Sequence, residues 1–336
     1  MFAKNPRPQG HLELIEIYSE SLENNLLGDS ATRQCPVYLP PDYHPEKSYP
    51  LIIELAAFGN SGLGRIGWQG FKESMPERLD RLIAEGMPPI IVAFPDCFTS
   101  LGGNQYINSS ALGNYEDFLK GDLLSALEAN FPCGGIGRRG LIGKSSGGYG
   151  ALVNGMRHAS TWSAIACHSG DMGFEWVYLP EIPKALMTLE NYGGSYENFL
   201  RTVQTSPKLK GNDFTTLMIL AMAASYDPNP NEYCGIQLPV TSTTADLIPE
   251  QWQNWLQWDP LEMVPHYLTN LKSLKFIFID CGIYDQYYLH FGARRLSSLL
   301  NNYQVPHIFE EFPDNHSGLD YRLDHSLPLM ARALST

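Results

Sequence analysis

The chain opens with two segments in which apolar and polar residues alternate. Residues 11–18 alternate regularly, and residues 32–39 do so less regularly before Pro40-Pro41 ends the run. Alternation of this kind is typical of β-strands with one exposed face. A turn near Gly28-Asp29 would let the two strands pair, so we predict two antiparallel strands at the edge of a sheet.

After these strands, apolar runs alternate with amphipathic stretches. Nearly continuous apolar runs indicate strands buried on both faces of a sheet, and apolar residues at helical spacing indicate helices. Strands separated by helices are joined by crossover connections, so the pattern predicts an α/β fold with a mostly parallel central sheet and helices on both faces. The predicted strands are 50–58, 89–94, 140–142, 161–166, 274–280 and 307–312, and the predicted helices are 75–86, 115–130, 149–156, 286–302 and 321–334.

This alternation is interrupted between residues 173 and 265. The segment mixes helices with loops and contains four of the six tryptophans, Trp176, Trp252, Trp255 and Trp258. Because no flexible linker flanks it, we predict that residues 1–336 form a single domain in which 173–265 is an insertion that caps the carboxyl edge of the sheet.

The composition excludes several classes of partner. A net charge of -13 and an isoelectric point near 5.1 argue against binding to nucleic acid or to an anionic membrane. Six cysteines lie far apart without a Cys-x-x-Cys pair, so we expect neither a zinc site nor a redox motif, and no other cofactor. Residues 1–11 contain no apolar signal core, and no stretch approaches the length of a membrane span, so a cytoplasmic location is expected. The sequence leaves open whether the chain forms a homo-oligomer.

The pentapeptide Gly143-Lys144-Ser145-Ser146-Gly147 stands between a predicted strand and a predicted helix. A serine in such a sharp turn needs strained backbone angles, and glycines two positions away leave room for them. The turn exposes the Ser145 hydroxyl above the sheet, as in the nucleophile elbow of α/β-hydrolases. The same letters also end a phosphate-binding P-loop, but Arg138 stands where that motif needs its first glycine.

A serine nucleophile needs a base within hydrogen-bond reach and a carboxylate that orients the base. His316 follows the predicted strand 307–312 directly, whereas His290 and His325 lie on predicted helices. Asp285 lies in the loop after the preceding strand, and we predict it as the acid. Two alternatives stay open, Asp280 at the strand end and, less well placed, Asp314.

The oxyanion formed during attack on an ester needs two backbone amides. Ser146 would supply one of them, at the start of the helix after the nucleophile. Phe58, or Ala57 beside it, would supply the other from the loop after an early strand. We also predict that three aromatic residues line the substrate pocket: Trp68, Tyr106 and Trp176.

With these residues in place, the chain resembles the esterase D family of α/β-hydrolases, also called the Putative esterase family, which includes S-formylglutathione hydrolases, feruloyl esterases, enterobactin-type esterases and mycolyltransferases. The resemblance implies a catalytic triad of Ser145, Asp285 and His316. The sequence differs from the family pattern at two places. Ala56-Ala57 stand where the family frequently has His-Gly, and Lys144 stands where it frequently has histidine. The matching segments are Gly28-Asp29 with 37–41, 113–119, 143–151, and Cys281-Gly282 with Asp285.

These observations predict a serine hydrolase that cleaves a small-molecule carboxylic ester or thioester through an acyl-enzyme, without a metal or nucleotide. One alternative is an acyltransferase of the same fold, in which an alcohol replaces water as the acceptor. Another is a non-catalytic binding protein that keeps the fold, although such a protein would not need a complete triad.

Overall fold

The computed structural model describes residues 9–336. Residues 1–8 lie outside the described residues. They belong to the segment 1–11, from which a cytoplasmic location is expected. Within the described residues, no helix is both long enough and apolar enough to cross a membrane.

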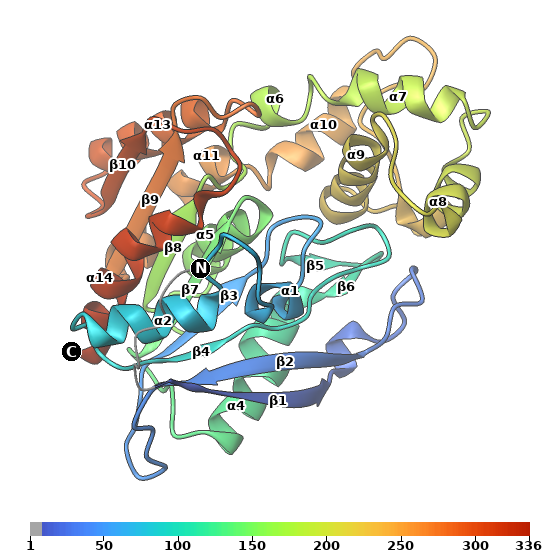
Figure 1. The fold of residues 1–336 in the computed structure, drawn as a ribbon. Coiled ribbons are helices and arrows are strands. Elements are labelled where there is room, and N and C mark those ends of the chain that lie inside the picture. Colours follow the sequence, from blue (N-terminus) through green and yellow to red (C-terminus); the bar gives the residue numbers. More distant parts are fainter. Residues whose placement is uncertain (1–8) are drawn as a thin grey trace.

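An eight-stranded sheet forms the centre of the molecule (Figure 1), with the strand order β1-β2-β4-β3-β7-β8-β9-β10. β1 pairs antiparallel with β2, β2 pairs antiparallel with β4, and the remaining neighbours are parallel. Both the predicted edge hairpin and the predicted mostly parallel sheet are therefore confirmed. The strands are β1 (His11–Tyr18), β2 (Thr32–Leu39), β3 (Leu51–Leu55), β4 (Ile91–Ala93), β7 (Arg139–Lys144), β8 (Ala164–His168), β9 (Phe276–Gly282) and β10 (Ile308–Phe312).

Helices cover both faces of this sheet. One face is covered by α2 and α14, which lie side by side in Figure 1 and are joined by ion pairs of Arg78 and Arg81 with Asp324. The other face packs against α4, α5 and α13. The α-helices outside the segment between β8 and β9 are α1 (Gly62–Ile66), α2 (Met75–Ala84), α3 (Tyr115–Asp117), α4 (Leu124–Asn130), α5 (Ser146–Arg157), α13 (Leu289–Asn302) and α14 (Leu323–Ser335).

The segment between β8 and β9 is mostly helical, and Figure 1 shows α7, α8, α9 and α10 grouped at one end of the sheet. Its central helix α9 is apolar on every side and almost wholly buried. Side chains of α9 belong to the same core cluster as side chains of α5, which supports the proposal that this segment is an insertion within one domain. The helices are α6 (Phe174–Val177), α7 (Ile182–Glu190), α8 (Tyr196–Thr205), α9 (Asp213–Tyr226), α10 (Pro249–Leu256), α11 (Pro260–Met263) and α12 (Leu268–Ser273).

Short elements occupy several connections. The long loop before α3 contains a small antiparallel ribbon, and a π-helical segment interrupts the helix predicted over 115–130. These elements are the ribbon strands β5 (Asn108–Ser109) and β6 (Gly113–Asn114), the π-helical η2 (Phe118–Leu123), and the 3-10 helices η1 (Glu20–Leu22), η3 (Tyr233–Gly235), η4 (Val264–His266) and η5 (Leu319–Arg322).

Candidate active site

Ser145 lies between β7 and α5 with φ 55° and ψ -126°, a conformation that a non-glycine residue rarely adopts. The neighbouring glycines make this turn possible. A Cβ atom on Gly143 would lie 2.3 Å from the backbone of Gly147, and one on Gly147 would lie 1.9 Å from the Leu55 carbonyl oxygen. The Ser145 amide donates a hydrogen bond to the His168 carbonyl at 3.0 Å, so the turn is also tied to β8.

His316 and Asp285 meet at the carboxyl edge of the sheet, as their positions after β10 and β9 predict. His316 Nδ1 lies 2.7 Å from Asp285 Oδ2, and both side chains are buried. The second oxygen, Asp285 Oδ1, accepts from the Tyr287 amide at 2.9 Å. The His316 amide donates to Gln286 Oε1 at 3.0 Å, so the loop that carries Asp285 also holds the backbone of His316.

The two alternative acids have other partners. Asp280 is buried between His168 Nδ1 and Arg322 Nε, each at 2.8 Å. Asp314 accepts from the hydroxyl of Tyr321 at 3.2 Å. Asp285 is therefore the carboxylate that contacts His316.

A cavity of about 110 Å³ contains both Ser145 and His316 in its wall. Its remaining lining is mainly apolar, with polar atoms concentrated near the nucleophile. The lining residues are Ala57, Phe58, Lys144, Ser145, Ser146, Asp171, Val177, Tyr178, Phe214, Met218, Tyr287, Leu289 and His316.

The residues proposed for the oxyanion site lie at this cavity. Ser146 is the first residue of α5, where free amides and the positive end of the helix dipole favour negative charge. Ala57 and Phe58 follow β3 and line the same cavity. The Phe58 ring packs edge-on against Phe214 of α9 at a centroid distance of 5.5 Å, which joins this loop to the helical insertion.

The three aromatic residues that the sequence assigned to the pocket, Trp68, Tyr106 and Trp176, do not line this cavity. Trp68 is 76% exposed, and Trp176 is 48% exposed with its ring beside Phe291. Tyr106 is buried in the core, where its hydroxyl donates to the Ala56 carbonyl at 2.6 Å. Large aromatic side chains serve packing as readily as binding, and sequence spacing does not separate these roles.

Two ionisable residues at the cavity were not assigned a role from the sequence. Burial lowers the pKa of Lys144, which precedes the nucleophile. Asp171 follows β8, and its side chain is buried beside Ser145 and Ser146. An acid shortly after a strand of this edge was the available signal for Asp171, because the carboxyl ends of parallel strands share that edge.

A second serine, histidine and aspartate are joined by hydrogen bonds on the face of the sheet that α14 covers. His168 contacts Asp280 through Nδ1 and Ser326 Oγ through Nε2, each at 2.8 Å. All three side chains are almost completely buried, and none lines the cavity. This group ties β8, β9 and α14 together and offers no path to a substrate.

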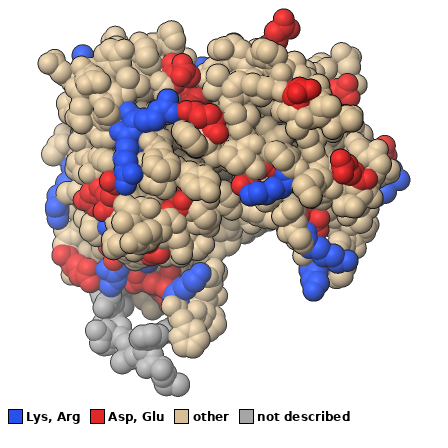
Figure 2. Space-filling view, turned by 90° about the horizontal axis from the view of Figure 1, so that it is seen from above, with Lys and Arg blue, Asp and Glu red and all other residues tan. Residues whose placement is uncertain are grey.

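Charges and metal-binding groups add little to the site. Figure 2 shows lysine and arginine in small groups among acidic residues on the face that it presents, and large areas without charge. Among residues 9–336, no group of three or more potential metal ligands comes together.

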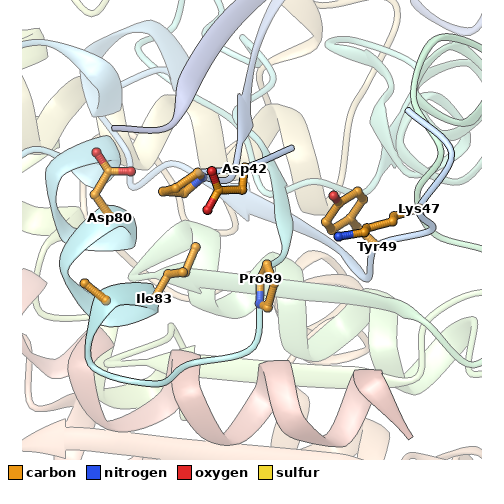
Figure 3. Close-up of a pocket in the computed structure, with 8 residues that line it drawn as sticks. Asp42, Lys47, Tyr49, Asp80, Ile83 and Pro89 are labelled. Carbon is orange, nitrogen blue, oxygen red and sulfur yellow. The ribbon is translucent and has the colours of Figure 1, made fainter. Parts of the chain in front are cut away.

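A separate surface hollow of about 340 Å³ lies between α2 and the loop after β2, with Asp42, Lys47 and Asp80 in its wall (Figure 3).

Comparison with known proteins agrees with this architecture. The family model described as "Putative esterase" matches residues 30–322, so the chain belongs to this family. No curated protein matches the chain.

Solved structures with the same fold cover nearly the whole chain. A ferulic acid esterase is 19% identical with a TM-score of 0.61, covering 97% of this chain and 99% of its own. The fluorophosphonate-binding serine hydrolase F of Staphylococcus aureus is 15% identical with a TM-score of 0.59, covering 96% and 99%. An S-formylglutathione hydrolase from Agrobacterium tumefaciens is 12% identical with a TM-score of 0.58, covering 99% and 98%. The fold is that of the α/β-hydrolase esterases, and the family places this chain among the carboxylic ester hydrolases.

Proposed function

We propose that the protein hydrolyses a small carboxylic ester or thioester through an acyl-enzyme on Ser145. The observation that carries this proposal is the 2.7 Å hydrogen bond between His316 Nδ1 and Asp285 Oδ2, at a cavity that also contains Ser145 in its strained turn. This is the arrangement that activates a serine alcohol, which is otherwise a weak nucleophile at neutral pH.

In the first half of the reaction, Ser145 Oγ attacks the ester carbonyl carbon while His316 Nε2 takes the hydroxyl proton. Asp285 fixes the ring tautomer with the Nδ1 proton and stabilises the imidazolium. The amides of Ser146 and of Phe58, or Ala57, would donate to the oxyanion. When the carbon–oxygen bond of an ester or the carbon–sulfur bond of a thioester breaks, His316 gives this proton to the leaving oxygen or sulfur, and the alcohol or thiol departs.

In the second half, water replaces the alcohol. His316 removes a proton from a water molecule while the water oxygen attacks the acyl carbon. The bond between that carbon and Ser145 Oγ then breaks. The proton passes to Ser145, and the carboxylic acid leaves. Every proton transfer uses one base, so the mechanism needs no metal ion.

The first prediction is that Ser145→Ala abolishes both covalent labelling by a fluorophosphonate probe and ester hydrolysis. We expect hydrolysis to fall by about 10⁴-fold or more, because removing the nucleophile ends acyl-enzyme chemistry. Labelling is read by mass spectrometry of the modified peptide, and hydrolysis by a panel of short-chain esters and thioesters.

Ser326→Ala is the matched control, because Ser326 also contacts a histidine that contacts an aspartate. This variant should keep both labelling and hydrolysis, even if it unfolds at a lower temperature. Labelling at a serine other than 145, or full activity of Ser145→Ala, would contradict the proposal.

A further inference from the structure

Asp171 is a buried carboxylate beside the proposed nucleophile, and the proposed mechanism gives it no task. Its side chain lines the cavity and is 5% exposed as a residue. Oδ2 accepts from Gln105 Nε2 at 3.0 Å, from the Tyr178 hydroxyl at 2.9 Å and from Ser146 Oγ at 3.3 Å. Among residues 9–336, the hydrogen-bond partner of Oδ1 is Ser145 Oγ, at 3.5 Å.

The partners of Asp171 hold it in one orientation. The Tyr178 hydroxyl also lies 3.0 Å from the hydroxyl of Tyr226, and the Tyr178 ring packs against Phe174 and Trp255. Because these rings are buried in the insertion, the carboxylate cannot turn away from the cavity without disturbing them. Oδ1 is therefore held beside Ser145 Oγ, the atom to which an acyl group would be joined.

A carboxylate at this place bears on the reaction because it lies beside the nucleophile. Burial raises the pKa of Asp171. A negative charge this close to Ser145 also opposes the oxyanion that forms during attack on a plain acyl group. Asparagine could hold the same loop without that charge, so packing alone does not account for an acid here.

We propose that Asp171 selects substrates whose acyl part carries a hydroxyl or ammonium group on the carbon next to the carbonyl. This inference rests on the proposed function, since it assumes that Ser145 Oγ bonds to the acyl carbon. A donor on that neighbouring carbon is three bonds from Oγ, and Oδ1 lies 3.5 Å from Oγ, so a hydrogen bond to Oδ1 is within reach.

A donor on the alcohol part fits less well. The alcohol oxygen also bonds to the acyl carbon, but a hydroxyl on an ordinary alcohol is at least two bonds farther from Oγ. The alcohol must also leave toward His316, which supplies its proton. The acyl part is the part that stays beside Asp171 throughout the acyl-enzyme.

The cavity also limits the size of the acyl group. Its volume of about 110 Å³ is below the range of roughly 300–1,000 Å³ that is usual for drug-sized ligands. The apolar side chains of Val177, Met218 and Leu289 form much of its wall. We therefore infer a short acyl chain with a single polar group, directed to Asp171.

The test uses four ethyl esters that differ in one substituent. Propionate, isobutyrate, 2-hydroxypropionate and 2-aminopropionate carry hydrogen, methyl, hydroxyl or ammonium on the same carbon, so size is matched between the last three. Hydrolysis by the full chain is followed as proton release at neutral pH. For the wild type we expect kcat/KM for at least one of the donor-bearing esters to exceed that for isobutyrate by about 10-fold or more.

Three variants test whether Asp171 causes any preference for the donor-bearing esters. Asp171→Asn should reduce the preference for the ammonium ester by about 10-fold or more, and that for the hydroxyl ester less, because the amide oxygen still accepts. Asp171→Leu should remove the preference for both. Asp259→Asn is the control. Asp259 is buried like Asp171 but accepts from the amides of Phe174 and Leu261, so its change should lower stability without altering the order of substrates.

A binding arm separates this inference from the proposed function. Ser145→Ala is titrated calorimetrically with the same esters, with and without Asp171→Asn, so the result does not depend on turnover. Tighter binding of a donor-bearing ester that Asp171→Asn weakens supports the inference, even if the chain hydrolyses no ester. Equal binding of all four esters, or a preference that survives Asp171→Leu, overturns it. A preference for a hydroxyl on the alcohol part, measured with 2-hydroxyethyl and propyl propionate, also overturns it.

Discussion

At the scale of single residues, each group of the proposed triad is held by a hydrogen bond that involves a backbone amide. The Ser145 amide is tied to the His168 carbonyl, Asp285 accepts from the Tyr287 amide, and the His316 amide donates to Gln286. Side chains fixed in this way need little reorganisation when a substrate binds. The site therefore depends on local backbone contacts as much as on the reacting atoms.

The second prediction concerns the acid. Asp285→Asn should lower kcat by up to about 10⁴-fold, because an amide favours the wrong tautomer of His316 and cannot stabilise its cation. The fold should survive, since asparagine keeps the shape of the side chain. Steady-state kinetics beside circular dichroism measures both effects on one sample.

Asp280 and Asp314 provide the controls for this prediction. Asp280→Asn breaks a buried pair with Arg322, so it should cost about 3 kcal/mol of unfolding free energy while the folded protein keeps its kcat. Asp314→Asn removes a partially exposed contact and should change neither quantity much. An active Asp285→Asn beside a folded but inactive Asp280→Asn would move the acid to the strand end.

At the scale of elements, the site depends on how closely α5 approaches β3. Gly147 lies so near the Leu55 carbonyl that no side chain fits between the helix and the strand. This contact sets where Ser146 begins α5, and so where its amide points. The sequence pattern predicted the strand, turn and helix, because glycines at fixed offsets are a local signal.

The third prediction tests that contact. Gly147→Ala should lower the free energy of unfolding by about 3 kcal/mol or more and reduce ester hydrolysis, because α5 must move away from β3. Gly121→Ala is the matched control, since Gly121 is also helical and a Cβ there meets no atom within 4 Å. That change should leave activity intact and raise stability by about 0.5–1 kcal/mol. Urea unfolding of both variants gives the two free energies. A Gly147→Ala protein as stable and as active as the wild type would show that the close approach is unimportant.

Other elements could be predicted only in part. The helix expected over 286–302 begins at Leu289, because Tyr288 adopts a left-handed conformation after the loop that carries Asp285. Residues 173–265 fold into helices whose buried faces contact parts of the chain far away in sequence. The position of Tyr178 against Asp171, and hence the polar side of the cavity, follows from those tertiary contacts and leaves no local pattern.

At the scale of the whole molecule, the sheet gathers residues that are far apart in the chain. Alternating strands and helices predicted that Ser145, Asp285 and His316 would reach one edge, because parallel strands end there together. The pattern did not predict which insertion residues would cover that edge. Trp68 and Trp176 are exposed and do not line the cavity, whereas Phe214, Met218 and Tyr178 of the insertion do.

Ion pairs also join α3 to the carboxyl end of α5, the helix that begins at Ser146. Glu116 of α3 receives hydrogen bonds from Arg157 Nε, at the end of α5, at 2.9 Å and lies 2.6 Å from His158 Nε2. Lys120 lies 3.8 Å from the same carboxylate. Burial alone would raise the pKa of Glu116, but the hydrogen bonds from His158 and Arg157 outweigh it and lower the pKa to about 2.

The fourth prediction follows from that pKa. A carboxylate whose pKa is lower in the folded chain than in the unfolded chain stabilises the fold above its unfolded pKa of 4.5, and this contribution is lost as the pH falls toward 2. Glu116→Gln should therefore melt several degrees below the wild type at neutral pH, and the difference should shrink between pH 4.5 and pH 2. Asp117→Asn, on the next residue and more exposed, is the control and should change the melting temperature little at any pH. A difference for Glu116→Gln that stays constant down to the acid limit would mean that its charge does not join α3 to α5, and that the deficit comes from packing alone.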